Sequence, residues 1–393
     1  MYKILTLNSI SVQGLRRLPR ERYEVASEIL RPDAVLVRSA KMHDMDIPAS
    51  VLAIGRAGAG TNNIPVEQMS SRGIPVFNAP GANANAVKEL VIGGMLLAAR
   101  NLCQAWEFTR QLPGEGAELD KAVEAVKKKF VGFELPSRTL GVIGLGAIGV
   151  QVANAALALG MRVIGFDPQI TVDRAWELSS GVEKARSLDE LFSRADIISL
   201  HVPLVEATRG LVNENRIALM PARSVVMNFS RGAVVDEAAV LAALANDRLA
   251  AYVCDFPSRQ LLASDKVIAL PHLGASTAEA EINCAVMVAD TVRDYLEHGT
   301  IRHSVNFPDA DLERRGAHRI TVANANVPNM VGQISSRLGD AGLNISDLLN
   351  KSRGNLAYTM VDLDGAPTAE ILASINAIDG VLCVRDLGRQ QAV

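Results

Sequence analysis

The chain has 393 residues, of which 49% are hydrophobic and 21% charged, and its formal net charge is −3. This is enough apolar material for two or three domains, each with its own core. The weak negative charge gives no basic field for nucleic acid, and no apolar run is long enough to cross a membrane. We therefore expect a globular protein that binds neither nucleic acid nor lipid.

The N-terminus and the cysteines indicate a cytoplasmic protein. The opening residues, MYKILTLNSI, lack the basic region, apolar core and cleavage site of a signal peptide, and are expected to form a strand. The four cysteines, at positions 103, 254, 284 and 383, lie far apart in apolar segments. Neither they nor the six histidines have metal-ligand spacing, so no metal is expected. Buried unpaired thiols fit a reducing cytosol.

The first third of the chain alternates short apolar strands with polar or helical stretches, a parallel α/β pattern. The expected strands are at residues 4–7, 34–37, 51–54 and 75–77. An apolar helix follows from about Val87. It leads into a polar connection whose basic run, residues 127–129, is expected to be a solvated face.

The segment TLGVIGLGAIG, residues 139–149, has the glycine spacing of a dinucleotide-binding turn between a buried strand and a helix. Gly144 allows the tight turn, Gly146 lets the backbone approach a pyrophosphate, and Gly149 lets the helix pack on the strand. The phosphates are expected at the helix N-terminus, beside Ala147 and Ile148.

A carboxylate follows the glycines at the distance that NAD recognition requires. Asp167 ends a second strand, residues 162–166, about 20 residues after the turn. A carboxylate there accepts hydrogen bonds from the ribose hydroxyls and repels the 2′-phosphate of NADP. The sequence therefore predicts NAD as the cofactor.

The remaining elements complete an α/β fold with a small third domain. Strands at 196–201, 224–229, 251–256 and 267–270 fit one doubly wound sheet, and a helix over about 277–298 is expected to return the chain to the first domain. From residue 319 the order βαββαβ predicts a ferredoxin-like module. The expected fold class is thus α/β, with two Rossmann-like doubly wound parallel-sheet domains and a C-terminal ferredoxin-like domain.

Two residues at strand ends suit the oxidation of a hydroxy acid. Such a reaction needs a cation for the carboxylate and a group that takes the hydroxyl proton. Arg231 follows strand 224–229 and His272 follows strand 267–270, at the sheet edge where ligands bind. A guanidinium fork suits a carboxylate, and histidine titrates near neutral pH. Both residue types are also common on solvated surfaces, so spacing alone leaves that alternative open.

The segments GLGAIG, SRGAVVDEAAV and PHLGAST make the chain similar to D-isomer-specific 2-hydroxyacid dehydrogenases over nearly its whole length. Within that family, VRSA at 37–40, GRAGAGTNNI at 55–64, IPVFNAP at 74–80 and the C-terminal module resemble the members that oxidise 3-phospho-D-glycerate, the first step of serine biosynthesis. The resemblance implies an NAD domain inserted into a substrate domain, and a homodimer or homotetramer. The expected boundaries are 1–87 and 283–306 for the substrate domain, 88–282 for the NAD domain and 317–393 for an ACT-like regulatory domain.

The resemblance also implies the site residues. Arg231 binds the substrate carboxylate and the oxygen at C2, and His272 exchanges the hydroxyl proton. The substrate-loop positions are Arg38, Ser39, Ala57, Gly58, Ala59, Gly60 and Asn83. The positions around the cofactor are Gly144, Gly146, Ala147, Ile148, Gly149, Asp167, Val202, Phe229, Asp255, His272, Leu273, Gly274 and Ala275.

One position departs from the family pattern. The glutamate that pairs with the histidine aligns with Gln260, and Asp255 is a weak substitute. A carboxylate partner stabilises imidazolium and raises its pKa. With a neutral amide instead, the reductive rate is expected to fall off at a lower pH than it would with a glutamate present.

The C-terminal module resembles an ACT domain, which in some relatives binds serine between paired copies. Asn326 and Asn344 match its amide ligands, and Asn324 replaces a family histidine. The turn that is usually Pro-Gly reads Pro328 and Asn329, and asparagine tolerates the left-handed conformation. Serine inhibition and a purely dimerising role both fit these residues.

Three functions fit the sequence. The first is oxidation of 3-phospho-D-glycerate, and the second is reduction of another 2-oxo acid such as glyoxylate or hydroxypyruvate. The phosphate-binding residues decide between them, and Arg38, Arg56 and Lys127–Lys129 are the candidates. The third is a non-catalytic protein that senses NAD(H) with the same fold; the intact Arg231 and His272 argue against it.

Overall fold

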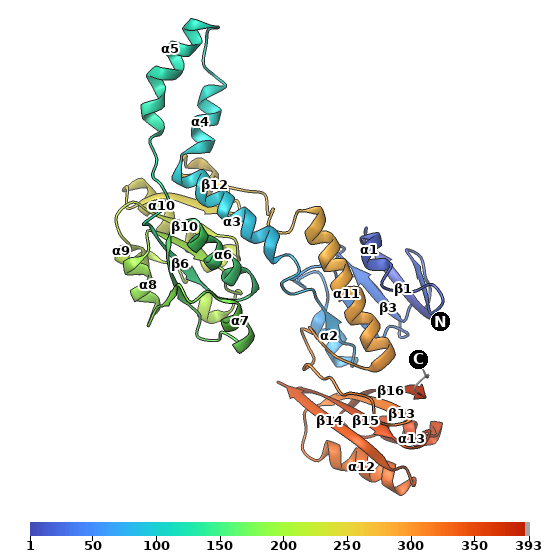
Figure 1. Ribbon diagram of the computed structural model, residues 1–393. Coiled ribbons are helices and arrows are strands. Elements are labelled where there is room, and N and C mark those ends of the chain that lie inside the picture. The colour runs from blue at the N-terminus through green and yellow to red at the C-terminus, as the bar shows by residue number, and fades with distance from the viewer. Residues whose placement is uncertain (390–393) are drawn as a thin grey trace. The chain divides into compact units, whose positions relative to one another are not determined.

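The computed structural model describes residues 1–389, which form two compact units (Figure 1). One unit contains residues 1–83 and the chain from Ala278 onward, and the other is Ala84–Thr277. The last four residues of the expected C-terminal domain, 390–393, lie outside the described part of the chain.

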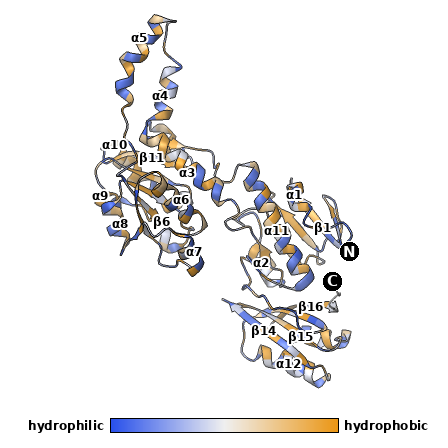
Figure 2. Cartoon of the chain, in the orientation of Figure 1, coloured by the Kyte–Doolittle hydropathy of each residue, from blue (hydrophilic) through white to orange (hydrophobic). Residues whose placement is uncertain are grey.

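The first unit begins with a five-stranded parallel sheet of order β2-β1-β3-β4-β5. Its helix α11 supplies much of the core, since Val288, Val292 and Leu296 are fully buried. Figure 2 shows hydrophobic and hydrophilic residues alternating along this helix, as expected for one packed on a sheet. The elements are β1 (Tyr2–Leu7), α1 (Val12–Leu15), β2 (Tyr23–Ala26), β3 (Ala34–Val37), β4 (Ala53–Arg56), α2 (Val66–Ser71), β5 (Val76–Phe77) and α11 (Ala278–His298).

The same unit carries a four-stranded antiparallel sheet of order β14-β15-β13-β16 with two helices. Its element order, βαββαβ, is ferredoxin-like. Buried Ala323, Tyr358 and Met360 of this sheet belong to the same hydrophobic core as α11. The elements are β13 (His318–Ala325), α12 (Met330–Asp340), β14 (Ile345–Arg353), β15 (Leu356–Leu363), α13 (Ala369–Asn376) and β16 (Val381–Arg389).

The second unit is a seven-stranded parallel sheet of order β12-β11-β10-β9-β6-β7-β8. Its central strands are buried along their whole length, because helices cover both faces. The strands are β6 (Thr139–Ile143), β7 (Arg162–Phe166), β8 (Val182–Lys184), β9 (Ile197–Leu200), β10 (Ser224–Asn228), β11 (Leu249–Cys254) and β12 (Val267–Ala269). The helices are α3 (Ala84–Ala99), α4 (Leu102–Thr109), α5 (Ala117–Val126), α6 (Ala147–Ala158), α7 (Val172–Glu177), α8 (Leu188–Arg194), α9 (Glu214–Leu219) and α10 (Glu237–Ala245).

The expected fold class is confirmed, with differences in detail. The expected polar connection after α3 contains two further helices, α4 and α5, neither of which buries any of its residues (Figure 1). Their apolar residues recur at helical spacing, as Leu119, Ala122 and Val126 do on α5, so the sequence does carry a helix signal there although none of these residues is buried in the chain. The short edge strands β2 and β8 were also not expected.

Within residues 1–389, none of the helices has the length and apolar character needed to span a bilayer.

Candidate active site and cofactor site

The three glycines of the fingerprint form the turn between β6 and α6. Gly144 has a φ of 90°, and a Cβ on it would lie 2.5 Å from the carbonyl oxygen of His201. A Cβ on Gly149 would collide with the carbonyl oxygen of Gly144. A Cβ on Gly146 would meet no heavy atom within 4 Å. The backbone at Gly146 therefore faces open space at the N-terminus of a 12-residue helix, which is what pyrophosphate binding requires.

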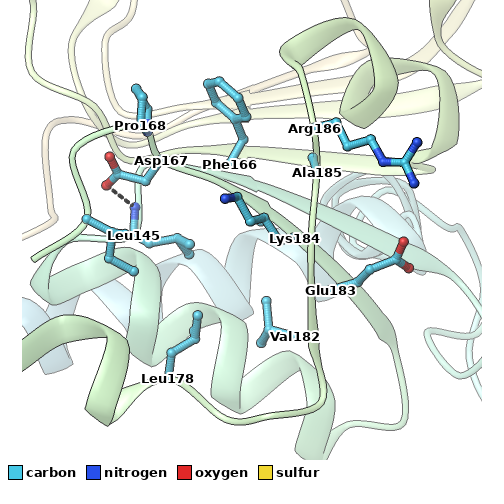
Figure 3. Close-up of a pocket in the computed structure, with 12 residues that line it drawn as sticks. Leu145, Phe166, Asp167, Pro168, Leu178, Val182, Glu183, Lys184, Ala185 and Arg186 are labelled. Carbon is cyan, nitrogen blue, oxygen red and sulfur yellow. Dashed lines mark hydrogen bonds between the residues drawn. The ribbon is translucent and has the colours of Figure 1, made fainter. Parts of the chain in front are cut away.

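Asp167 follows β7, and two backbone N–H groups hold its carboxylate. Leu145 N donates to Oδ2 at 2.8 Å (Figure 3), and Gln169 N donates to Oδ1 at the same distance. A carboxylate offers about four lone-pair sites, so acceptor capacity remains for ribose hydroxyls. Asp167 lines a pocket of about 490 Å³ between the ends of β7 and β8, into which Lys184 also points (Figure 3). The glycine turn and Asp167 together fit NAD.

Arg231 lies in a turn that a buried amide holds in place. Asn228, the last residue of β10, is fully buried. Its Nδ2 donates to the carbonyl oxygen of Arg231 at 2.9 Å, and its Oδ1 accepts from the N–H and hydroxyl of Ser230 at 3.1 and 2.9 Å. The Arg231 side chain is exposed and donates to Ser230 O at 2.6 Å. Sequence reasoning missed Asn228; its signal was an amide ending an apolar strand.

His272 lies just beyond β12 in a strained backbone conformation. Its φ is 56°, a region that costs a non-glycine residue about 1–3 kcal/mol and that clusters at functional sites. The ring is exposed and meets the Phe256 ring edge-on, with centroids 5.1 Å apart. Asp255 is 2% exposed, and its carboxylate accepts from Leu273 N at 2.8 Å and Gly274 N at 2.9 Å. Asp255 thus fixes the backbone that carries His272.

Arg231, Asp255 and His272 lie at the same end of the sheet, beyond the carboxyl ends of its strands. The strands β10, β11 and β12 are parallel neighbours, so Arg231, Asp255 and His272 lie beyond adjacent carboxyl ends. This edge is where open parallel sheets bind ligands. Of the other expected cofactor positions in this unit, Phe229 and Gly274 are buried, Ala147, Ile148 and Val202 are half-buried, and Leu273 and Ala275 are exposed.

Another histidine at this edge, His201, is a poor acid/base. Its Nε2 lies 2.8 Å from the hydroxyl of Ser199, and within the described residues its buried Nδ1 has no hydrogen-bond partner. Burial lowers the pKa of His201 to about 3, because an apolar environment disfavours the imidazolium. His201 therefore stays neutral near pH 7 and is a poor proton donor there.

Gln260 is exposed, at the start of a short 3-10 turn, Leu261–Ala263. The loop that contains Gln260 contacts a carboxylate through another residue: the hydroxyl of Ser258 donates to Glu237 Oε2 at 2.7 Å. Sequence reasoning did not anticipate this contact, which joins the loop to the start of α10.

The expected substrate-loop residues belong to the first unit. Arg38 follows β3 and pairs with Glu281 at the start of α11. The N–H groups of Ser39 and Ala40 donate to Asn8 Oδ1 at 3.1 and 2.5 Å. The loop after β4 is held by Ala57 N to Val37 O (2.8 Å), Ala79 N to Gly58 O (3.0 Å) and Asn78 Nδ2 to Ala59 O (2.5 Å). Gly60 and Asn83 are half-buried.

The three asparagines of the C-terminal module differ in their surroundings. Asn324 is 1% exposed, and across residues 1–389 its buried Oδ1 finds no hydrogen-bond partner. Asn326 Nδ2 donates to Gly354 O at 3.1 Å, and Asn344 Nδ2 to Asp364 Oδ2 at 2.6 Å. Asn329 has a φ of 62° immediately before α12, the left-handed turn expected of it.

Comparisons with known proteins identify the family. Residues 92–274 match the family model of the D-isomer specific 2-hydroxyacid dehydrogenase, NAD binding domain. The D-3-phosphoglycerate dehydrogenase of Methanocaldococcus jannaschii is 36% identical over 92% of this chain and 69% of its own length. That of Haemophilus influenzae is 34% identical over 86% and 81%. The NAD⁺-bound 3-phosphoglycerate dehydrogenase of Entamoeba histolytica has a TM-score of 0.60 at 26% identity, covering 78% of this chain and 98% of that one.

The relatives above 30% identity extend over most of both chains, and they confirm the expected resemblance to this family. The matched model is that of an NAD binding domain, which confirms the expected cofactor. The chain therefore belongs to the D-isomer specific 2-hydroxyacid dehydrogenase family.

Proposed function

We propose that the chain catalyses the NAD-dependent oxidation of 3-phospho-D-glycerate to 3-phosphohydroxypyruvate, the first step of serine biosynthesis. The observation that carries this proposal is the similarity, at 36% and 34% identity, to two D-3-phosphoglycerate dehydrogenases over most of their length. The strand-end placement of Arg231 and His272 beside a dinucleotide turn supports it.

The proposed mechanism assigns one task to each group. The guanidinium of Arg231 binds the carboxylate and the C2 oxygen, which orients C2 and stabilises negative charge on that oxygen. His272 accepts the hydroxyl proton during oxidation and returns it during reduction. The glycine turn and Asp167 would hold NAD, whose nicotinamide would supply the acceptor for the hydride of C2. Asn228 and Asp255 hold the backbone of the two turns, so both groups are pre-organised.

A substrate panel tests the proposal. Consumption of NADH is followed with 3-phosphohydroxypyruvate, hydroxypyruvate and glyoxylate, and kcat/KM should be highest for the phosphorylated acid. A higher value for glyoxylate or hydroxypyruvate would assign the chain to the second candidate function. Tight NADH binding without turnover of any of the three would support the sensing protein instead.

Gln260→Glu should move the acid/base midpoint of the reductive rate to higher pH by about one unit, because a nearby carboxylate stabilises the imidazolium that donates the proton. The measurement is a pH profile of kcat/KM for reduction. Gln260→Met serves as the uncharged control. A midpoint that stays in place in the glutamate variant would show that position 260 does not tune the histidine.

We propose that two copies of the chain associate through α4 and α5. These helices bury none of their residues within the chain, and isolated helices of this length are marginal in water. Trp106 and Leu102 on α4 are 64% and 44% exposed, an apolar surface suited to a second copy. Trp106→Glu should therefore lower the sedimenting mass to that of a monomer. Trp176→Glu, at the other exposed tryptophan, should leave it unchanged; equal masses for all three proteins would place the interface elsewhere.

The C-terminal module is proposed to bind serine. The buried Asn324 Oδ1 without a hydrogen-bond partner among the described residues supports a ligand role, because a buried unpaired acceptor is costly. Calorimetric titration with L-serine should give heat, together with inhibition of turnover. Neither heat nor inhibition would leave the module a role in assembly alone.

The protein is proposed to work in the cytoplasm. Cys103, Cys254, Cys284 and Cys383 are all free thiols, as expected in a reducing compartment. Fractionation of the cells that produce it should place the chain with cytoplasmic enzymes; recovery from an oxidising compartment would contradict this.

A further inference from the structure

The backbone after β3 is held by side chains from three other segments. The carbonyl oxygen of Arg38 accepts from Arg56 Nε at 3.1 Å and from Asn63 Nδ2 at 3.4 Å. On the other side, Asn8 Oδ1 accepts the two N–H groups that follow Arg38. The loop is thus anchored at its main chain, and what remains to be fixed is the long Arg38 side chain.

Glu281 fixes that side chain. Arg38 Nη2 donates to Glu281 Oε1 in a hydrogen-bonded ion pair that connects positions 243 residues apart. The two side chains are 37% and 42% exposed, so the guanidinium is held at a surface that a solute can reach. Glu281 lies in the first turn of α11, where the helix dipole favours a negative charge.

A second guanidinium lies beside the first. Arg56 bonds the carbonyl oxygen of Arg38, and its Nη1 lies 2.5 Å from where a Cβ on Gly58 would be, so Gly58 leaves room for it. Burial raises the pKa of the Cys284 thiol, while the positive charges of Arg56 and Arg38 oppose that rise. Both cations therefore face this turn of α11, and the cluster of two arginines and Glu281 carries a net positive charge.

This arrangement suits the binding of an anionic ligand, because the arginine that would bind it is already held in position. An unanchored arginine loses rotamer freedom when it binds an anion, and two neighbouring guanidinium groups repel each other. The carboxylate of Glu281 reduces both the loss of rotamer freedom and the repulsion. It accepts a hydrogen bond from one N–H group of Arg38, and the other N–H groups of the guanidinium can still bind a ligand.

We propose that Glu281 is a positioning residue that holds Arg38 ready for an anionic group of the substrate, its phosphate or its carboxylate. The inference rests on the function proposed above and on the placement of Arg38 in the substrate loop. In this proposal Glu281 contributes to substrate affinity and takes no part in proton or hydride transfer.

The test is a steady-state comparison of Glu281→Ala, Glu281→Gln and Glu279→Ala. Glu281→Ala should raise KM for 3-phosphohydroxypyruvate about tenfold with kcat nearly unchanged, because Arg38 loses the partner that fixes its side chain. A tenfold change corresponds to a modest loss of binding energy. Glu281→Gln should lie between, since its amide oxygen still accepts from Arg38. Glu279→Ala removes the same charge from the same exposed turn and should match the wild type. An unchanged or lower KM in Glu281→Ala, or an equal rise in Glu279→Ala, overturns the proposal.

A double variant tests whether Glu281 acts through Arg38. In an Arg38→Ala background, Glu281→Ala should have no further effect on KM. An equal effect in both backgrounds overturns the positioning role.

Failure here can be told apart from failure of the proposed function. Wild-type turnover of 3-phosphohydroxypyruvate with an unaltered KM in Glu281→Ala overturns only the role of Glu281. No wild-type turnover overturns the proposed function, and calorimetric titration with 3-phospho-D-glycerate then tests Glu281 directly. Equal dissociation constants for the wild type and Glu281→Ala would overturn the role of Glu281, and about tenfold weaker binding by the variant would support it.

Discussion

His272→Asn should lower kcat for reduction of the 2-oxo acid by about 10²–10⁴-fold, the usual contribution of a positioned acid/base. Asparagine is the informative replacement because His272 has a φ of 56°. Asparagine tolerates that region far better than most residues, so the loop held by Asp255 should keep its backbone. The variant therefore removes the proton-exchanging group with little change in its surroundings.

The control for this variant is His43→Asn, which removes an exposed histidine from a loop of the first unit and should leave kcat unchanged. Thermal unfolding of both variants should match that of the wild type, so that a lost fold is not mistaken for lost chemistry. If His272→Asn retained more than about a tenth of wild-type kcat, the acid/base would be another group.

Asp362→Ala should lower the free energy of unfolding of the first unit by about 3–5 kcal/mol, because it leaves a buried guanidinium unpaired. Asp362 on β15 and Arg319 on β13 face each other in the antiparallel register and are 0% and 1% exposed. Arg319 Nε and Nη2 donate to the two carboxylate oxygens at 2.6 and 2.9 Å. The backbone N–H groups of Arg315 and Gly316 also donate to Asp362 Oδ2, at 2.7 and 3.4 Å.

The loss of stability should extend beyond the C-terminal module, because its buried arginines also donate hydrogen bonds to carbonyl oxygens at the end of α11. Arg319 Nη1 donates to His298 O at 3.2 Å, and Arg385 donates to Tyr295 O at 3.2 Å and Leu296 O at 3.0 Å. Urea denaturation with hydrogen–deuterium exchange of β13, β15 and α11 amides measures the effect. Glu183→Ala breaks a similar bidentate pair with Arg194, but an exposed one that solvent screens, and should change the free energy of unfolding far less. Equal losses in the two variants would contradict the buried-charge explanation.

The same pair predicts a pH dependence of stability. Burial alone would raise the pKa of Asp362, but the Arg319 guanidinium and the two backbone N–H groups outweigh it and hold the pKa below its ordinary value. A lowered pKa in the folded state contributes stability above the pKa of the unfolded carboxyl, about 3.9. That stability is lost as pH falls through the lower folded value. The wild type should therefore approach the stability of Asp362→Asn in strong acid.

The parts of this fold that depend on local sequence were predictable. The glycine turn, Asp167, Arg231 and His272 each adjoin an apolar strand, and such strands stand out in sequence. The comparisons confirm the family, the NAD domain and the fold class, while the roles of the individual site residues stay predictions.

The parts that depend on distant partners were not predictable. Glu281 and Arg38 are 243 residues apart, and Arg319 and Asp362 pair only once the strand register is known. The carboxylate of Asp255 accepts from the backbone of the His272 loop, a contact that the sequence did not predict. The helices α4 and α5 were not predicted either, although their apolar residues recur at helical spacing; none of these residues is buried in its own chain.

The formation of NADH from NAD⁺ and 3-phospho-D-glycerate by the wild-type protein tests the proposed activity most directly, with 3-phospho-L-glycerate as the control. We predict formation with the D-isomer only, abolished by Arg231→Ala and by His272→Asn. No NADH from the D-isomer at any pH, or equal rates with the two isomers, would contradict the account.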